Sequence, residues 1–128
     1  MSNVKRITPS SFNNEVLQAA MPVIVVFVAK GDGRNNRAVI TAIRLGKMSD
    51  GEVTVGYIEG SLEDKIFKKY RIPSIPTTVV FKGGSAIAHH YGEASVEKLK
   101  RMLGTAGLDV EEDEEDEEEE EEGEARRA

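Results

Sequence analysis

The sequence predicts an α/β fold in which helices flank a central mixed β-sheet, followed by an acidic tail. Three observations lead to this prediction. Strand-like and helix-like segments alternate through the first 107 residues, and a pair of glycines joins two neighbouring strands without a helix between them. Acidic residues, in contrast, are concentrated after Leu108. The first two observations indicate a folded domain, and the third indicates a separate tail.

Charge sets the boundary between the two parts. The formal net charge of -6 comes from 17 Lys and Arg residues against 23 Asp and Glu residues. Fourteen of the acids follow Leu108, and every position from Glu111 to Glu122 is acidic, so residues 1–108 carry a net charge of +6 and the remainder carries -12. The acidic run lacks the apolar surface that would offset the entropy of ordering it. We therefore expect a folded domain at residues 1–107 and a disordered acidic tail at residues 108–128.

The chain contains no cysteine, which excludes disulfides, thiolate metal sites and thiol nucleophiles. It also shows no Ser-His-Asp order, paired-carboxylate motif or P-loop. No apolar run approaches the roughly 20 residues that span a bilayer, and residues 1–11 lack the apolar stretch of a secretory signal. We expect a cytoplasmic protein that is not an enzyme, needs no cofactor or metal, and does not enter a membrane.

The first predicted elements are a helix and a buried strand. Thr8 before Pro9 is typical of a helix start and predicts a helix over residues 9–20. Residues 23–28 are consecutive apolar and mostly β-branched side chains, the pattern of a strand covered on both faces. A loop at residues 30–34 and a helix ending at Met48 follow. Polar side chains lie at helical spacing along one side of this helix and its preceding loop; these are Arg34, Arg37, Thr41, Arg44 and Lys47.

The next predicted elements are a strand over residues 53–58 and a short helix. Ser61 is the expected cap of this helix, because acids follow it in the first turn and bases gather at the end. Its expected buried stripe consists of Leu62, Ile66, Phe67 and Tyr70.

The last predicted elements are a hairpin and a helix. Gly83 and Gly84 tolerate the positive φ angles of a tight turn, so residues 77–81 and 85–91 are expected to pair as antiparallel strands. Ser95 is placed to cap a final helix that Gly104 ends. With a first strand ahead of the helix at residues 9–20, the predicted order of elements is β-α-β-α-β-α-β-β-α.

This order, with a proline just ahead of the fourth strand, resembles the thioredoxin fold over approximately residues 3–104. The matching segments are Val23–Ala29 as the central strand, Ser74-Ile75-Pro76-Thr77 as the cis-proline segment, Phe81-Lys82-Gly83-Gly84 as the hairpin, and Gly92 after the last strand. The resemblance implies a Cys-x-x-Cys motif at the start of the second helix. Here the equivalent stretch is Asp32-Gly33-Arg34-Asn35, so Asp32 and Asn35 replace both sulfurs. Val26 also stands where the family has a buried acid, and we expect a redox-inactive member.

The resemblance further implies a docking surface for extended partner chains beside the cis-proline, where the backbone of residue 75 pairs with a peptide as an added strand. Its expected members are Gly33, Arg34, Ser74, Ile75, Pro76, Gly92 and Glu93. A protein partner or client follows, which makes the chain an adaptor or assembly chaperone. The cysteine-free motif and acidic C-terminus resemble the phosducin-like proteins, which act on chaperonins and G-protein βγ dimers. The loop and the run from Phe81 to Gly84 resemble the thioredoxin-like hydrogenase-maturation chaperones.

Several alternatives remain open at this level. The loop from Gly31 to Arg34 could cradle a phosphate, although Asp32 is more readily explained as a helix cap. The basic face of Arg37, Arg44 and Lys47, with Arg34 and with Lys65, Lys68 and Lys69 of another helix, could bind nucleic acid or a ribosome. His89 and His90 are adjacent in a strand and should point to opposite faces, which prevents them from sharing a metal.

The acidic tail also has several possible roles. It could promote solubility, bind Ca²⁺ or a basic protein weakly, or act as an intramolecular competitor for the basic domain. We favour the last role, because the two opposite charges attract within a Debye length of roughly 10 Å at 0.1 M salt.

Overall fold

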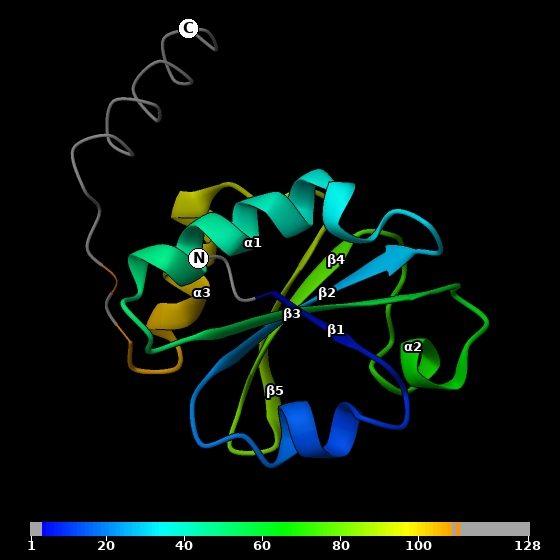
Figure 1. The fold of residues 1–128 in the computed structure, drawn as a ribbon, viewed down its shortest axis with the longest axis horizontal. Coiled ribbons are helices and arrows are strands. Elements are labelled where there is room, and N and C mark those ends of the chain that lie inside the picture. The colour runs from blue at the N-terminus through cyan, green and yellow to red at the C-terminus, as the bar shows by residue number, and fades with distance from the viewer. Residues whose placement is uncertain (1–3, 109, 111–128) are drawn as a thin grey trace, which may run out of the picture.

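The computed structural model describes residues 4–108 and Val110, which form a five-stranded sheet covered by helices on both faces (Figure 1). The strand order is β1-β3-β2-β4-β5. The strands are β1 (Val4–Ile7), β2 (Val23–Ala29), β3 (Thr54–Gly60), β4 (Thr77–Lys82) and β5 (Ser85–Tyr91). β1, β3 and β2 run parallel, whereas β4 and β5 are antiparallel to their neighbours. The predicted mixed sheet flanked by helices is therefore confirmed.

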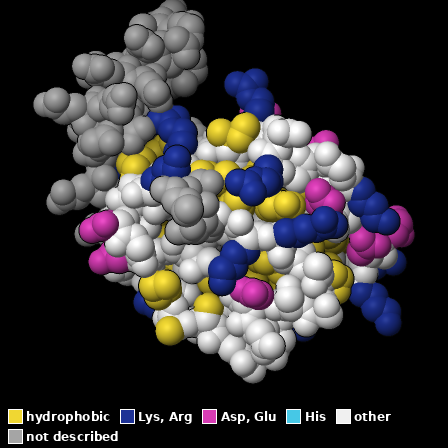
Figure 2. Space-filling model, in the orientation of Figure 1, with side chains coloured by type: hydrophobic (Ala, Val, Ile, Leu, Met, Phe, Trp, Pro, Cys, Tyr) yellow, Lys and Arg dark blue, Asp and Glu magenta, His cyan; other side chains and the backbone are white. Residues whose placement is uncertain are grey.

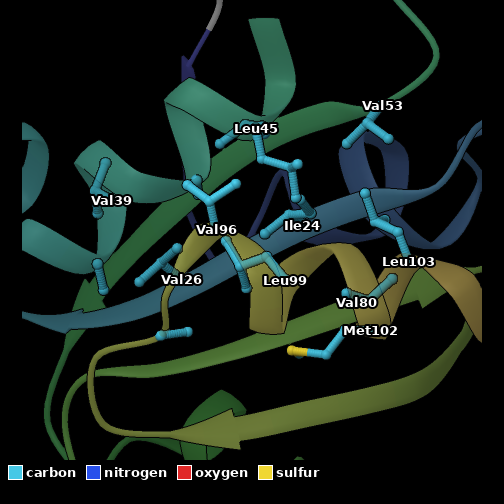
Figure 3. Close-up of a cluster of buried hydrophobic side chains, with 14 of the residues drawn as sticks. Ile24, Val26, Val39, Leu45, Val53, Val80, Val96, Leu99, Met102 and Leu103 are labelled. Atoms are coloured by element: carbon cyan, nitrogen blue, oxygen red, sulfur yellow. The ribbon is translucent and has the colours of Figure 1, made fainter. Parts of the chain in front are cut away.

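The helices divide between the two faces of the sheet. α1 (Arg37–Met48) and α3 (Val96–Gly104) pack on one face, and η1 (Asn13–Leu17) and α2 (Lys65–Lys69) pack on the other. Each face has its own hydrophobic cluster; Figure 3 shows the cluster beneath α1 and α3.

The central strand β2 explains why two clusters form. Its residues from Val23 to Val28 are at most 1% exposed, because successive side chains enter opposite clusters. Ile24, Val26 and Val28 contribute to the α1–α3 cluster, and the alternate residues contribute to the other. Burial of a side chain of this size stabilises the fold by about 1.5–3 kcal/mol. The unbroken apolar run predicted this strand correctly.

The hairpin and the start of the last helix also form where the local sequence predicted them. Gly83 and Gly84 have φ angles of 61° and 84°, as the tight turn requires. The Oγ of Ser95 accepts a hydrogen bond from the Lys98 backbone N–H at 3.0 Å and caps α3. Gly104, however, belongs to the final turn of α3. The left-handed residue that ends this region is Gly107, with a φ of 80°.

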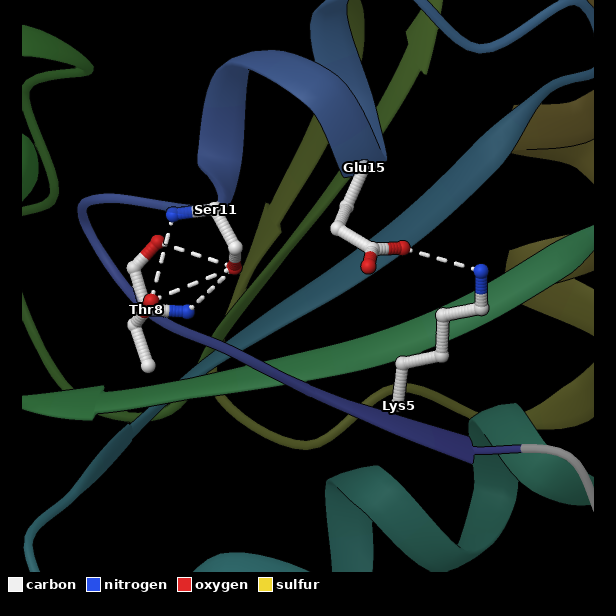
Figure 4. A network of polar contacts seen from close by, with 4 residues as sticks. All are labelled: Lys5, Thr8, Ser11 and Glu15. Atoms are coloured by element: carbon white, nitrogen blue, oxygen red, sulfur yellow. Dashed lines mark hydrogen bonds and ion pairs between the residues drawn. The ribbon is translucent and has the colours of Figure 1, made fainter.

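The predicted helix over residues 9–20 is wrong in extent, since only the short π-helix η1 forms there. Thr8 and Ser11 instead close a turn, in which each backbone N–H donates to the hydroxyl of the other residue at 3.0–3.1 Å (Figure 4). The hydroxyl of Thr8 therefore serves a turn that precedes the helix. Lys5 of β1 pairs with Glu15 of η1 at 2.9 Å and fixes this segment beside the sheet edge.

The predicted start of the short helix at Ser61 is also wrong. The Asp64 carboxylate accepts a hydrogen bond from the Ser61 N–H at 3.1 Å, and this turn delays α2 until Lys65. Because the turn directs Leu62 outward, that side chain is 39% exposed and does not belong to the buried stripe. Phe67 is fully buried, and Ile66 and Tyr70 pack against the same cluster.

Two residues beyond the expected end of the domain at residue 107 are packed against the domain. Leu108 and Val110 contact the α1–α3 cluster, where Val110 is 8% exposed. The rest of the predicted disordered tail lies outside the described residues. No helix in the described part of the chain is long and apolar enough to cross a membrane.

Candidate functional site

One end of the sheet gathers the segments that were predicted to form the docking surface. Thr77, at the start of β4, pairs with Phe27 near the end of β2 and with Tyr91 at the end of β5. The loop after β2, the segment before β4 and the turn after β5 therefore share this end (Figure 1). The predicted residues come from these three segments.

Hydrogen bonds from Gly92 and Thr77 hold the segment from Ser74 to Pro76 in place. The Ile75–Pro76 peptide bond is cis, and the Pro76 carbonyl accepts a hydrogen bond from the Gly92 N–H at 2.7 Å. The hydroxyl of the buried Thr77 donates to the Ser74 carbonyl at 2.8 Å. Ser74 is exposed, whereas Ile75 and Pro76 are half-buried. This backbone is thus fixed in place while part of it remains accessible.

The Ile75 backbone makes no hydrogen bond of its own. Neither its N–H nor its carbonyl has a partner within residues 4–108. Glu93 is exposed on the neighbouring turn, where its carbonyl oxygen lies 3.1 Å from His90 Nε2. An extended peptide laid beside Ile75 would meet an unused donor and an unused acceptor.

The loop after β2 forms a turn before α1 begins. The Asn35 N–H donates to the Asp32 carbonyl at 2.9 Å, and the chain makes the single 3₁₀ turn η2 (Gly33–Asn35). The cap of α1 is therefore Asn36, whose Oδ1 accepts a hydrogen bond from the Ala38 N–H at 2.8 Å. The interpretation of Asp32 as the cap is wrong, because its carboxylate accepts no backbone hydrogen bond at the start of η2.

The positions expected to correspond to the Cys-x-x-Cys motif lie on the surface of this loop. Asp32, Arg34 and Asn35 are exposed, whereas Gly33 is buried with a φ of 37°. A Cβ at Gly33 would lie 2.7 Å from the Glu59 carboxylate, so only glycine fits without a shift of that side chain. A carboxylate this close disfavours an anion at the loop, which weakens the phosphate-cradle alternative.

Sequence reasoning did not single out Glu59. It lies at the carboxyl end of β3, pairs in register with Val28, and has an ion pair with Arg6 at 3.5 Å. The carboxyl ends of adjacent parallel strands meet at one edge of a sheet. The position of Glu59 at the end of a predicted parallel strand was therefore an available signal.

Tyr91 is a second residue that the sequence reasoning missed. Its side chain is 52% exposed and stacks on His89, with ring centroids 5.1 Å apart. The alternation of side chains along β5 could have indicated this pair. Tyr91 pairs in register with Thr77, the residue that follows Pro76. Within the described ranges, no group of three or more His, Asp or Glu side chains could hold a metal.

The predicted basic residues do not form one surface. Arg37, Arg44 and Lys47 lie on α1, and the lysines of α2 lie on the opposite face of the sheet. The combined nucleic-acid surface of both helices is therefore wrong. Figure 2 shows Lys and Arg side chains spread across the face that carries β1 and α1. Ile40 interrupts this basic helix surface and is 46% exposed.

A groove of about 420 Å³ lies away from Pro76, between α1 and the edge of the sheet at β1. Its apolar lining includes Val4, Ile43 and Val55, and Lys47 and Asp50 are its charged members.

Burial also perturbs one ionisable group near the sheet. Tyr70 packs against Phe12 and Phe81, with ring centroids 5.4 and 5.2 Å away. Desolvation by this burial raises the pKa of Tyr70 above its ordinary value. The phenol is therefore held in its neutral form.

Comparison with known proteins identifies the family. A family profile described as thioredoxin matches residues 3–105. The chain belongs to the thioredoxin family. Thioredoxin 1 of a Nostoc species is 30% identical over 103 residues, which cover 80% of this chain and 96% of the relative. The thioredoxin of Rickettsia prowazekii is 35% identical over 81 residues, covering 63% and 77% of the two chains. The thioredoxin of a Synechocystis species is 29% identical over 87 residues, covering 68% and 81%. This thioredoxin-family chain contains no cysteine.

Proposed function

We propose that this chain is a redox-inactive protein-binding module of the thioredoxin family, acting in the cytoplasm as an adaptor or assembly chaperone. It docks extended partner segments at the Pro76 surface, defined as Gly33, Arg34, Ser74, Ile75, Pro76, Gly92 and Glu93. The observation that carries the proposal is the free Ile75 backbone beside Pro76, in a chain without a single thiol.

The redox part of the proposal follows from the side chains at positions 32 and 35. Thiol–disulfide exchange begins with attack by a thiolate and proceeds through a mixed disulfide. The carboxylate of Asp32 and the amide of Asn35 cannot form that bond, and both lie exposed where the family motif would stand. The surface can therefore bind a partner without reacting with it.

The docking part follows from the backbone. A partner strand gains affinity from main-chain hydrogen bonds and specificity from the side chains around it. Ile75 supplies the backbone groups, and Tyr91, whose exposed ring stacks on His89, lies opposite Thr77 in the neighbouring strand. The cysteine-free motif and acidic C-terminus resemble the phosducin-like proteins, and the run from Phe81 to Gly84 resembles the hydrogenase-maturation chaperones; both resemblances support an adaptor or chaperone role without naming a client.

The test compares two substitutions at Ile75 in the full chain. Ile75→Pro removes the backbone donor, whereas the matched Ile75→Ala keeps the donor and removes the side chain. Proteins retained by the immobilised wild-type chain should bind Ile75→Pro about fivefold or more weakly, since one lost hydrogen bond costs about 1 kcal/mol. They should bind Ile75→Ala more strongly than Ile75→Pro. Equal retention by Ile75→Pro, with its circular dichroism spectrum unchanged, would exclude docking at this backbone.

A reduction assay tests the redox part separately. The wild-type chain should not accelerate the dithiothreitol-dependent precipitation of insulin. Acceleration above the uncatalysed rate would contradict the proposal.

A second candidate function, association with nucleic acid or a ribosome, is favoured by the three bases of α1 on one helix. If all three contact phosphates of a single strand, the logarithm of affinity should fall against that of salt with a slope of about -2. Docking at the Pro76 surface should be much less sensitive to salt. The slope measured with a single-stranded oligonucleotide, and its fall to about -1.4 in Arg37→Glu, where two phosphate contacts remain, would distinguish the two functions.

A further inference from the structure

α1 carries a second charged surface that the Pro76 surface does not use. The helix contains three bases and no acid between Arg37 and Met48. Arg37 and Lys47 are exposed, and neither forms an ion pair with any side chain of the described residues. Cations that no ion pair neutralises favour an acidic ligand. We call Arg37, Arg44 and Lys47 the α1 basic surface.

Val110, the residue just before the acidic run, is packed in the cluster beneath α1. Val110 is buried in the cluster that also contains Leu45 of α1 and Val53. Figure 1 shows the carboxyl end of the described chain close to the end of α1 that follows Lys47. The uninterrupted acids start one residue later, at Glu111. The residue that precedes the acidic run is thus packed in the cluster that α1 covers.

The length of the acidic run is sufficient to cover α1. The 12 residues of α1 extend over about 18 Å at 1.5 Å per residue. The acidic positions from Glu111 to Glu122 can extend over at most about 40 Å at 3.3–3.6 Å per residue. Covalent attachment also makes the contact intramolecular, with an effective concentration in the millimolar range.

The lysines of α2 are a poorer binding site for the acidic run than the bases of α1. Lys68 already pairs with Glu63 at 3.7 Å, and α2 lies on the opposite face of the sheet from α1. We propose that the α1 basic surface is a binding site for acidic polypeptide segments, and that residues Glu111 to Glu122 of the same chain occupy it. An external acidic partner then binds α1 by displacing this run.

A spin label tests the proposal in the full chain. Because the chain contains no cysteine, Glu117→Cys introduces a single attachment site for a nitroxide in the acidic run. At low salt, the nitroxide should reduce the backbone amide signals of α1 at least twofold relative to the reduced label, and leave α2 unaffected. At 1 M NaCl, where the Debye length is about 3 Å, the α1 signals should recover.

Two matched charge reversals locate the contact. Arg37→Glu/Arg44→Glu/Lys47→Glu and Lys65→Glu/Lys68→Glu/Lys69→Glu each replace three bases by three acids. The α1 reversal should abolish the reduction of the α1 amide signals by the nitroxide. The α2 reversal should leave that reduction unchanged. Signal loss that persists in the α1 reversal, is as strong on α2 as on α1, or is missing at low salt would overturn the proposal. Ile75→Pro should leave the reduction of the α1 amide signals unchanged. The spin-label result therefore tests this inference separately from docking at the Pro76 surface.

Discussion

Removal of the Asn36 side chain should destabilise the domain, whereas removal of the Asp32 side chain should not. Asn36 Oδ1 accepts the Ala38 N–H at 2.8 Å and satisfies one of the free amides at the start of α1. Loss of such a cap costs about 1 kcal/mol, within a range of about 0.5–2 kcal/mol. Asp32 accepts only a 3.5 Å contact from the Asn36 amide, so Asp32→Ala should change the stability by less than about 0.5 kcal/mol.

Thermal and urea unfolding of the full chain, followed by far-ultraviolet circular dichroism, would measure the difference. For a domain of about 100 residues, a loss of 1 kcal/mol lowers the melting temperature by about 4 °C. Asn36→Asp is the matched control, because it retains an acceptor oxygen and places a negative charge at the helix start. It should remain within about 0.5 kcal/mol of the wild type.

The reasoning would be refuted if Asp32→Ala cost as much as Asn36→Ala. That outcome would place the effective cap four residues earlier and make α1 begin within the stretch from Asp32 to Asn35. Gly33 and Arg34, two members of the Pro76 surface, would then belong to the helix instead of its preceding turn.

Two further predictions concern the face of the sheet that α2 covers. Phe67→Ala should cost about 3–5 kcal/mol, because the ring is fully buried and packs edge-on against Phe27 at 5.1 Å. Leu62→Ala should cost less than about 1 kcal/mol, and equal losses in urea unfolding would contradict the turn at Ser61. Burial raises the pKa of Tyr70 above 10.0, so the folded state keeps the phenol proton to a higher pH than the unfolded state. Stability should therefore fall as the pH rises above about 10, and unfolding measured at about pH 9 and 11 should show a smaller fall for Tyr70→Phe. An equal fall in the variant would assign the loss to other groups.

Local side-chain chemistry predicted the features that depend on neighbouring residues. The unbroken apolar and mostly β-branched run over residues 23–28 indicated a strand buried on both faces, which removes every one of its side chains from water. Gly83 and Gly84 indicated the hairpin because their backbone tolerates positive φ angles. Ser95 indicated the start of α3 because a hydroxyl three residues ahead of an N–H can accept its hydrogen bond.

Competition between similar signals accounts for the local errors. Asp32, Asn35 and Asn36 are all good cap residues within five positions, and only the η2 turn leaves the last of them beside the free amides of α1. Ser61 and Asp64 compete in the same way, and their mutual turn delays α2. Each choice depends on where the whole loop is anchored, which a short window of sequence does not contain.

The sequence by itself determined the fold class, the loss of every thiol and the separation of charge between the first 108 residues and the acidic run. Each of these is a property of composition or of nearest neighbours. Only the tertiary structure placed α1 and α2 on opposite faces, and so divided the basic residues into two separate surfaces. It also brought Glu59 close to Gly33 and Tyr91 of β5 opposite Thr77 of β4. These contacts join residues far apart in the chain, because strand pairing and helix packing fix them.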